Sequence, residues 1–372
     1  MAAALRRRHE AAQDAGAIQL TGLPMTDAPG PIEPLGRSGQ PVLDQLAFER
    51  LSVAHRRELK LHCYRMMGSL NEADDLVQET FLKAWRGRSQ FDGRGSVRGW
   101  LYSIATNSCL NAIKARSSAR RIIEQPERPP SEGRATGGPA TEFAWLEPYP
   151  DAELPDIADD RPGPEARYEA REAVRLAFVA AIQLLPPRQR AVLLLCDVLG
   201  WSSIETAHLL GGTTASINSA LQRARATLGG RYPQGRPLQR LLPSPDEGLL
   251  LERYMQAWQA DNLDGLVELL RDDAIYHMPP WQEWYRGRPA ISAFLGSVWG
   301  NFAGYRAVAI GANAQPAVGV YALGRQDFVW RPHSLHVMEP ADGKIASLTI
   351  YVPPLGPTLF AAFGLPPEPI AP

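Results

Sequence analysis

The chain has 372 residues, of which 45% are hydrophobic, and a formal net charge of −1. This composition is typical of a globular protein of two or three domains and excludes a uniformly polycationic chain. No apolar run approaches the ~20 residues of a membrane-spanning helix, so we expect a cytoplasmic protein without membrane contact. The cysteines Cys63, Cys109 and Cys196 form no CxxC pattern, and we expect no metal site, cofactor or disulfide framework.

The first 121 residues divide into an extension and a basic helical block. Residues 1–45 are rich in glycine, proline and alanine and have weak periodicity, which predicts a flexible extension. Residues 46–121 contain few prolines and many arginines, and their apolar residues recur at helical spacing. We expect an all-α domain in this block.

The segment NEADDLVQETFLKAW, residues 71–85, predicts an amphipathic helix with an acidic face. Leu76, Val77 and Phe81 recur at the spacing of one buried face. The residues that share the other face are Glu72, Asp75 and Glu79, widened by Asp74 and Gln78. Solvated helices usually mix signs, because like charges three or four residues apart repel. We therefore expect this face to bind a basic protein partner rather than DNA.

The next helical pattern, RGWLYSIATNSCLNAIKAR, lies among basic and aromatic residues. Basic side chains follow a phosphate backbone, and aromatic rings stack on unpaired bases. We expect this helix to contact single-stranded nucleic acid. Its candidate residues are Trp100, Asn107, Asn111, Lys114 and Arg116. Packing in the protein core is the alternative role for Trp100.

Residues 122–165 separate this block from a second helical one. They are rich in proline, glycine and acidic residues, which predicts a linker. The linker also contains the aromatic cluster FAWLEPY, and a purely flexible tether rarely carries such a cluster. We therefore expect part of the linker to contact a folded domain.

Residues 166–232 predict a helix-turn-helix. Pro187 suits the first position of a helix, Ser202 and Glu205 form a capping box, and Gly211 with Gly212 makes a turn. Ile204, Ala207 and Leu210 would form the buried stripe of the short middle helix. A polar face on the last helix can read base edges in the major groove. The residues proposed for it are Thr214, Ser216, Asn218, Ser219, Gln222 and Arg223. A plain helical hairpin with a solvated face is the alternative.

Residues 248–372 mix helices with strands. Helical patterns cover 249–261, 263–270 and 289–299, and strand patterns include AIYHMPP, GVYALG, LHVME and IASLTIYV. We expect a third domain of the α+β class. The complete chain is therefore predicted to be multidomain, with two all-α domains joined by an acidic linker and a C-terminal α+β domain.

Two of these regions together resemble a bacterial RNA polymerase sigma factor of the extracytoplasmic-function (ECF) class. The resemblance rests on ADDLVQETFLKAW, on FDGRGSVRGWLYSIATNSCLNAIKAR and on the helix-turn-helix segment. It implies that residues 46–121 are sigma region 2 and residues 166–232 are sigma region 4. It also implies that the chain binds core RNA polymerase, recognises and melts promoter DNA, and directs transcription initiation without being an enzyme.

The resemblance implies a role for each candidate face. Core polymerase would be bound by Asp74, Asp75, Gln78 and Glu79, with apolar contact from Phe81. The helix that ends in KAR would bind the minus-ten element, and the last helix of the helix-turn-helix would bind the minus-thirty-five element. An anti-sigma partner is not identified by the sequence.

Residues 248–372 resemble the SnoaL-like (nuclear transport factor 2-like) cone, a curved sheet wrapped around helices. The pattern RYMQAWQADNLDGLVELLRDDA followed by GRPAI supports this resemblance. Residues expected near its pocket are Asp272, His277, Trp281 and Tyr285, with Asp273, Trp284 and His336 nearby. We expect the domain to modulate sigma activity by touching the linker. The expected contact residues are Trp145, Leu146, Glu147 and Pro148.

Two other functions fit parts of the sequence. A cone-fold enzyme with a DNA-binding head would use a pocket aspartate as a general base. A ligand-sensing one-component regulator would combine the cone with the helix-turn-helix. The regulator leaves the acidic helix and the basic, aromatic block unexplained, so the sigma factor is preferred.

Overall fold

The computed structural model describes residues 44–91, 96–115, 129–133, 137–141, 144–155, 173–229 and 245–369. Almost all of the predicted extension, residues 1–45, lies outside this part of the chain. The helices and strands described below belong to one structural unit, residues 43–372.

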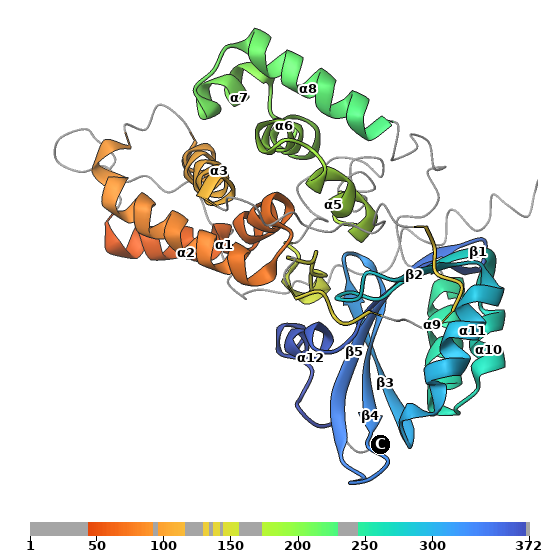
Figure 1. The fold of residues 1–372 in the computed structure, drawn as a ribbon. Coiled ribbons are helices and arrows are strands. Elements are labelled where there is room, and N and C mark those ends of the chain that lie inside the picture. Colours follow the sequence, from red (N-terminus) through yellow and green to blue (C-terminus); the bar gives the residue numbers. More distant parts are fainter. Residues whose placement is uncertain are drawn as a thin grey trace, which may run out of the picture. The chain divides into compact units, whose positions relative to one another are not determined.

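The first helical domain contains α1 (Gln45–Met67), α2 (Leu70–Gly87) and α3 (Val97–Ala115), with a 3-10 turn at Arg88–Gln90 (Figure 1). Helix α1 ends at Gly68, which has a φ of 70° and donates its N–H to the carbonyl of Tyr64. Glycine adopts this conformation without steric cost. A Cβ at Gly68 would lie 2.9 Å from Leu146 Cδ1. Glycine therefore ends the helix and also lets the linker approach it closely.

The second helical domain confirms the predicted helix-turn-helix. It contains α5 (Leu176–Gln183), α6 (Pro187–Leu193) continued by a π-helical turn (Leu194–Val198), α7 (Ser203–Leu210) and α8 (Thr214–Gly229). Ser202 and Glu205 form the predicted capping box, and Gly211 ends α7 with a φ of 61°. Ala207 and Leu210 are buried as expected. The expectation for Ile204 was wrong: it is 71% exposed, because the buried face of α7 is formed by Thr206, Ala207 and Leu210 and Ile204 lies on another side of the helix.

The C-terminal domain has two helices before its first strand and a third after its second strand. The helices are α9 (Pro245–Gln259), α10 (Leu263–Glu268) and α11 (Arg288–Val298), followed by a 3-10 turn at Trp299–Asn301. The strands are β1 (Leu270–His277), β2 (Trp284–Arg286), β3 (Gly304–Ala312), β4 (Gln315–Leu323), β5 (Trp330–Ala341) and β6 (Lys344–Tyr351). Helix α12 (Leu355–Leu359) and a 3-10 turn (Phe360–Phe363) follow the last strand.

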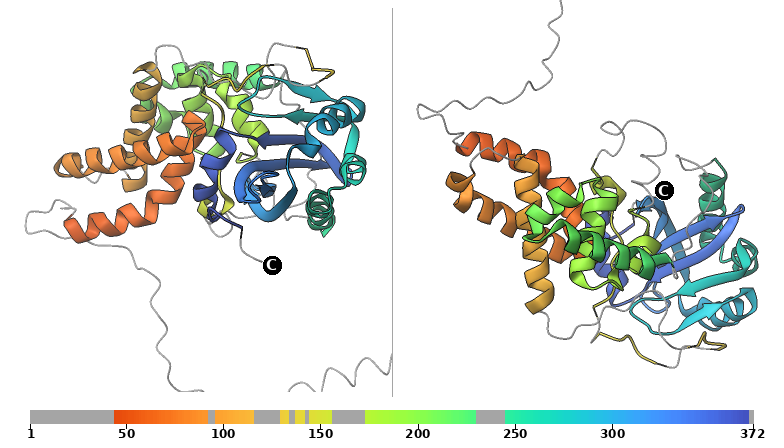
Figure 2. Two further views of the ribbon diagram at one scale, coloured as in Figure 1. Left: turned by 60° about the horizontal axis from the view of Figure 1, so that its bottom comes forward. Right: turned by 90° about the horizontal axis from the view of Figure 1, so that it is seen from above.

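The strands form one six-stranded sheet in the order β2-β1-β6-β5-β4-β3. Only the β1–β6 pair is parallel, and the long hairpins β3–β4, β4–β5 and β5–β6 are antiparallel. Figure 2 shows α9, α10 and α11 on one side of the sheet and α12 toward the other.

The two faces of the sheet enter two different hydrophobic cores. Because side chains alternate along a strand, Leu348 and Ile350 of β6 pack with α9 and α11, inside the cone. Tyr351 lies on the outer face and joins the core that includes Leu146 and Tyr149 of the linker. The outer face of the sheet is therefore part of the interface with the rest of the chain.

The structure confirms the predicted fold class of two helical domains followed by an α+β domain. In the described ranges, no helix is both long and apolar enough to cross a membrane.

Candidate functional site

The acidic face of α2 is exposed to solvent along most of its length. Asp75, Gln78 and Glu79 are exposed, and Glu79 Oε1 lies 2.5 Å from Lys83 Nζ one turn later. Asp74 is less free, because its carboxylate lies 2.8 Å from Lys60 Nζ of α1. The same Lys60 ammonium contacts the carboxylate of Glu153, so this basic residue connects the acidic face to the linker.

Two apolar residues lie beside this face, Phe81, which was expected to contact a partner, and Leu82. Phe81 is half-buried and packs edge-on against Phe48, with ring centroids 6.4 Å apart, inside the first helical domain. The next residue, Leu82, is 56% exposed. Leu82 therefore offers more apolar surface to a partner than Phe81 does. The sequence signal for this was a leucine at a position of the helical pattern that is otherwise polar.

The face of α3 with the predicted minus-ten residues is solvent-exposed at Asn107, Asn111 and Lys114. Spacings of four and three residues place these side chains on one side of the helix. Trp100 is half-buried and packs against Phe91, with centroids 5.2 Å apart, which supports the core-packing alternative. Arg116 lies outside the described residues.

The second helical domain packs close to this face of α3. The hydroxyl of Ser103, one turn before Asn107, donates to the carbonyl of Leu209 in α7 at 3.4 Å. The rings of Tyr102 and Trp201 meet edge-on with centroids 5.3 Å apart. The first helix of the helix-turn-helix is therefore a neighbour of the predicted minus-ten helix.

The predicted minus-thirty-five residues all lie on α8 and all are exposed, but some have local partners. Thr213 caps the start of α8: its hydroxyl accepts from the Ser216 N–H, and its own N–H donates to the Ser216 hydroxyl. Asn218 accepts a hydrogen bond of 2.5 Å from Ser203 of α7, and Ser219 accepts one of 2.6 Å from Arg223. Thr214 and Gln222 are exposed beside them. Arg223 is exposed as well, with one guanidinium nitrogen bonded to Ser219.

The linker motif, residues 145–148, contacts the first helical domain through its backbone and the carboxylate of Glu147. Glu147 donates its N–H to the carbonyl of Gly68 at 3.0 Å, and its carboxylate accepts from the Leu70 N–H at 2.6 Å, at the start of α2. An acidic group at this position stabilises a helix N-terminus. Leu146 and Pro148 are buried, and Trp145 is half-buried.

Asn313, at the tip of the β3–β4 hairpin, connects three parts of the chain and was missed in the sequence. Its side chain accepts from the N–H of Tyr149 at 2.8 Å and donates to the carbonyl of Val174 at 2.8 Å and to the hydroxyl of Tyr64 at 3.1 Å. It is completely buried, with a φ of 57°. Asparagine between two alternating strands is a turn signal, but a sequence does not show what the turn contacts.

Gln315, the first residue of β4 after the turn, strengthens the same contact. The side-chain carbonyl of Gln315 accepts from the N–H of Leu176, at the start of α5, at 2.9 Å. The N–H of Ala314 donates to the carboxylate of Asp151 at 2.7 Å, and Pro150 forms an isolated antiparallel bridge with Ala312. The C-terminal domain thus holds the linker and the start of the second helical domain.

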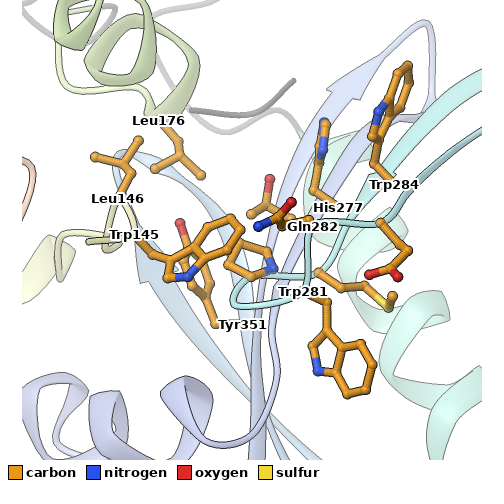
Figure 3. Close-up of a pocket in the computed structure, with 12 residues that line it drawn as sticks. Trp145, Leu146, Leu176, His277, Trp281, Gln282, Trp284 and Tyr351 are labelled. Carbon is orange, nitrogen blue, oxygen red and sulfur yellow. The ribbon is translucent and has the colours of Figure 1, made fainter. Parts of the chain in front are cut away.

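A pocket lies between the linker and the outer face of the sheet (Figure 3). Its walls are Trp145, Leu146, Leu176, His277, Met278, Pro279, Trp281, Gln282, Glu283, Trp284, Thr349 and Tyr351. Of the residues predicted near a pocket, His277, Trp281 and Trp284 line it. Asp272 lies elsewhere, with its side chain 92% exposed and paired with Arg288.

The remaining predicted pocket residues also lie away from this pocket. Tyr285 is buried inside the cone, stacked on Phe294 with centroids 4.4 Å apart. His336 is buried there too, hydrogen-bonded to Tyr254 and Ser334 at 2.7 Å each. Asp273 is exposed and pairs with Arg271.

Burial of His277 should make the free energy of unfolding depend on pH in the acid range. Burial lowers the pKa of His277 to about 4, whereas an unfolded histidine has a pKa of about 6.5. Between these pH values the unfolded chain binds a proton that the folded chain excludes, so the free energy of unfolding falls as the pH drops. The full shift corresponds to about 3 kcal/mol.

His277→Gln should therefore flatten the dependence of the free energy of unfolding on pH by about one proton between pH 6.5 and 4.5. Urea unfolding at several pH values measures this slope. His208→Gln, at an exposed position of α7, is the control. Equal slopes for the His277 variant and the wild-type chain would contradict the prediction.

Comparisons with known proteins decide the family. Family models match residues 51–119 as Sigma-70 region 2, residues 175–228 as Sigma-70 region 4, and residues 251–348 as a SnoaL-like domain. The ECF RNA polymerase sigma factor SigG of Mycobacterium tuberculosis is 43% identical over 327 residues, which cover 86% of this chain and 84% of that protein. The chain belongs to the ECF sigma factors.

Two further ECF sigma factors are similar to this chain, one in sequence and one in structure. The ECF sigma factor SigM of Mycobacterium tuberculosis is 28% identical over 185 residues, 50% of this chain and 76% of that protein. The crystal structure of the ECF sigma factor SigJ from the same organism aligns with a TM-score of 0.52 and 21% identity, covering 86% of this chain and 99% of that one. SigJ therefore has the same fold.

These findings confirm the resemblance that the sequence indicated. As an ECF sigma factor, the protein binds core RNA polymerase and promoter DNA and serves transcription initiation. The roles of single residues on α2, α3 and α8 remain predictions.

Proposed function

We propose that the SnoaL-like domain regulates this sigma factor by holding it in a closed state. The observation that carries the proposal is Asn313, whose buried side chain bonds the linker, α1 and the segment before α5 at the same time. In the same state α7 packs beside the predicted minus-ten face of α3. Promoter binding by α3 would require α7 to move away.

The faces proposed for each partner follow from charge and exposure. Asp75, Gln78, Glu79 and Leu82 of α2 dock on core polymerase, and Asp74 joins them when Lys60 releases it. Asn107, Asn111 and Lys114 of α3 contact the minus-ten element, and Gln222 and Arg223 of α8 contact the minus-thirty-five element. A linker that is bonded to the cone at Tyr149 and Asp151 is unavailable to follow a path through the polymerase. The protein acts where polymerase and DNA are, in the cytoplasm.

The SnoaL-like domain is proposed to act without catalysis. The fold includes enzymes, so its function must be argued from its residues. Asp272, the candidate base, is exposed to solvent and pairs with Arg288 at 3.0 Å, so it does not lie in an enclosed pocket where a substrate could meet it. The interior of the cone is occupied by packed rings, among them Trp258 and Tyr305 with centroids 4.9 Å apart.

Run-off transcription with core RNA polymerase on a matched promoter tests this proposal. The full-length protein is compared with a chain that ends at Gly230. We expect both to initiate and the shorter chain to give more transcript. Equal transcript from both would overturn regulation by the SnoaL-like domain, and less transcript from the shorter chain would make that domain an activator.

A further inference from the structure

The pocket between linker and cone is built from parts that separate when the protein opens. Trp145 and Leu146 belong to the linker and Leu176 begins α5, whereas the remaining walls belong to the SnoaL-like domain. In Figure 3, Trp145 lies beside Tyr351 and Gln282, and Leu146 and Leu176 close the side opposite His277. A molecule in this pocket would touch both parts of the closed protein.

This pocket is distinct from the interior of the cone. Tyr276 of β1 and Leu348 of β6 point inward, into the core with α9 and α11. Their neighbours His277 and Thr349 alternate to the other face and line the pocket. The pocket therefore lies on the outer face of the sheet, where the linker covers it.

Three polar side chains of the walls, His277, Gln282 and Thr349, line this space. His277 is 6% exposed, and its ring forms no hydrogen bond with any described residue. It stacks on Trp284 with centroids 5.9 Å apart, which fixes the plane of the imidazole. Thr349 is also buried, and neither its hydroxyl nor the Gln282 amide is hydrogen-bonded within the described ranges. The pocket therefore offers polar groups that a bound molecule or water can pair with, beside a mostly apolar lining.

The chemistry of the walls restricts the ligand. Trp145, Trp281 and Tyr351 offer aromatic surface, and Met278 adds a polarizable thioether. Burial keeps His277 neutral at pH 7, so it offers one donor and one acceptor. The charged wall residue is Glu283, which accepts from the Gly137 N–H at 2.9 Å. With a carboxylate and no cationic side chain among its walls, the pocket disfavours anions.

We propose that this pocket binds a small planar aromatic molecule with an N–H or O–H group, and that the bound molecule keeps the linker on the cone. The second half rests on the proposed regulatory function. A ligand whose site exists only in the closed state shifts the equilibrium toward that state. At a free concentration of about 100 times its Kd, it raises the closed-to-open ratio roughly 100-fold. The expected sign is repression of transcription.

The binding half is tested with 5-fluoroindole as the probe and the full-length protein. Its ¹⁹F NMR signal should shift or broaden saturably with the wild-type chain. Gln282→Trp places a large ring into the pocket from a half-buried position. It should raise the Kd of the probe about tenfold or more, because the ring takes up space that the probe would occupy. His277→Phe keeps the aromatic stack and removes both ring nitrogens, and should weaken binding as well. Leu249→Trp adds the same ring at an exposed site outside the pocket and should bind like the wild-type chain.

Absence of saturable binding to the wild-type chain at millimolar probe would overturn the proposed site. Equal affinity in the Gln282→Trp variant would overturn it too, because the probe would then bind elsewhere.

Run-off transcription with and without the probe tests the regulatory half. We expect 5-fluoroindole to reduce transcription by the wild-type chain and not by Gln282→Trp. If the probe raises transcription by the full-length chain, the regulatory half is overturned. It is also overturned if the probe has no effect on the full-length chain although the chain that ends at Gly230 is more active; neither result affects the binding half. Binding to the pocket with equal transcription by the full-length and shortened chains would support the site and overturn the proposed function instead.

Discussion

An Asn313→Gly variant will direct more transcription than the wild-type chain. Glycine accepts the φ of 57°, so the β3–β4 turn is retained while the side chain is lost. The Tyr149 N–H, the Val174 carbonyl and the Tyr64 hydroxyl then lose a partner at a buried site. The Tyr64 hydroxyl still donates to the Glu147 carbonyl, so two groups are left unsatisfied. Each costs about 1–3 kcal/mol, so the equilibrium constant for docking of the SnoaL-like domain should fall about 100-fold or more. Run-off transcription with core polymerase measures the result.

The matched control is Asp342→Gly in the β5–β6 turn. Asp342 has a φ of 54° and also lies at the tip of a hairpin, but its side chain is exposed and pairs with Arg271. This variant makes the same kind of turn substitution outside the interface and should transcribe like the wild-type chain. Equal activity of the two glycine variants would show that Asn313 does not hold the closed state.

An Arg190→Met variant will lose much of the stability of the helical domains. The buried guanidinium donates to the side-chain carbonyl of Gln183 at 2.6 Å, to its backbone carbonyl at 2.8 Å and to the carbonyl of Leu185 at 3.3 Å. It also donates to the carbonyl of Met66 in α1, across the two domains. Methionine fills similar space but leaves these oxygens facing an apolar side chain. We expect a loss of about 3–5 kcal/mol in the free energy of unfolding.

Thermal unfolding followed by circular dichroism at 222 nm should show a Tm lower by roughly 5–10 °C. Arg188→Met, on the same helix and exposed, is the control, because its guanidinium makes a 3.4 Å contact with the carbonyl of Leu210 at the surface. A Tm for Arg190→Met equal to that of Arg188→Met would contradict the prediction.

The architecture was predictable because its signals are local. The Ser202–Glu205 capping box and the glycine turn at Gly211 depend on neighbours a few residues apart, and the structure shows both as expected. The acidic stripe on α2 also followed from spacing alone, and Asp75, Gln78 and Glu79 of this stripe are exposed. Such patterns are complete within one helix and need no knowledge of the rest of the fold.

The contacts between domains were not predictable from spacing. The linker motif signalled a contact through its aromatic residues, but the residue that holds it, Asn313, is separated from Tyr149 by 164 positions. Phe81 illustrates the same limit within a domain, because its helical position leaves open whether the ring faces a partner or Phe48. Similarly, alternation along β1 separates Tyr276 from His277, but does not tell which side the linker covers.

The hydrogen bonds of Asn313 join parts of a single polypeptide, and this has a consequence for gene dosage. An inhibitor made as a separate protein can be outnumbered when its target is overproduced, and it dissociates on dilution. A domain on the same chain is present at one copy per sigma factor at every level of synthesis, and its effective concentration does not change on dilution. The fraction of open protein is then independent of how much is made, so the output of its promoters should rise in proportion to synthesis, without a threshold.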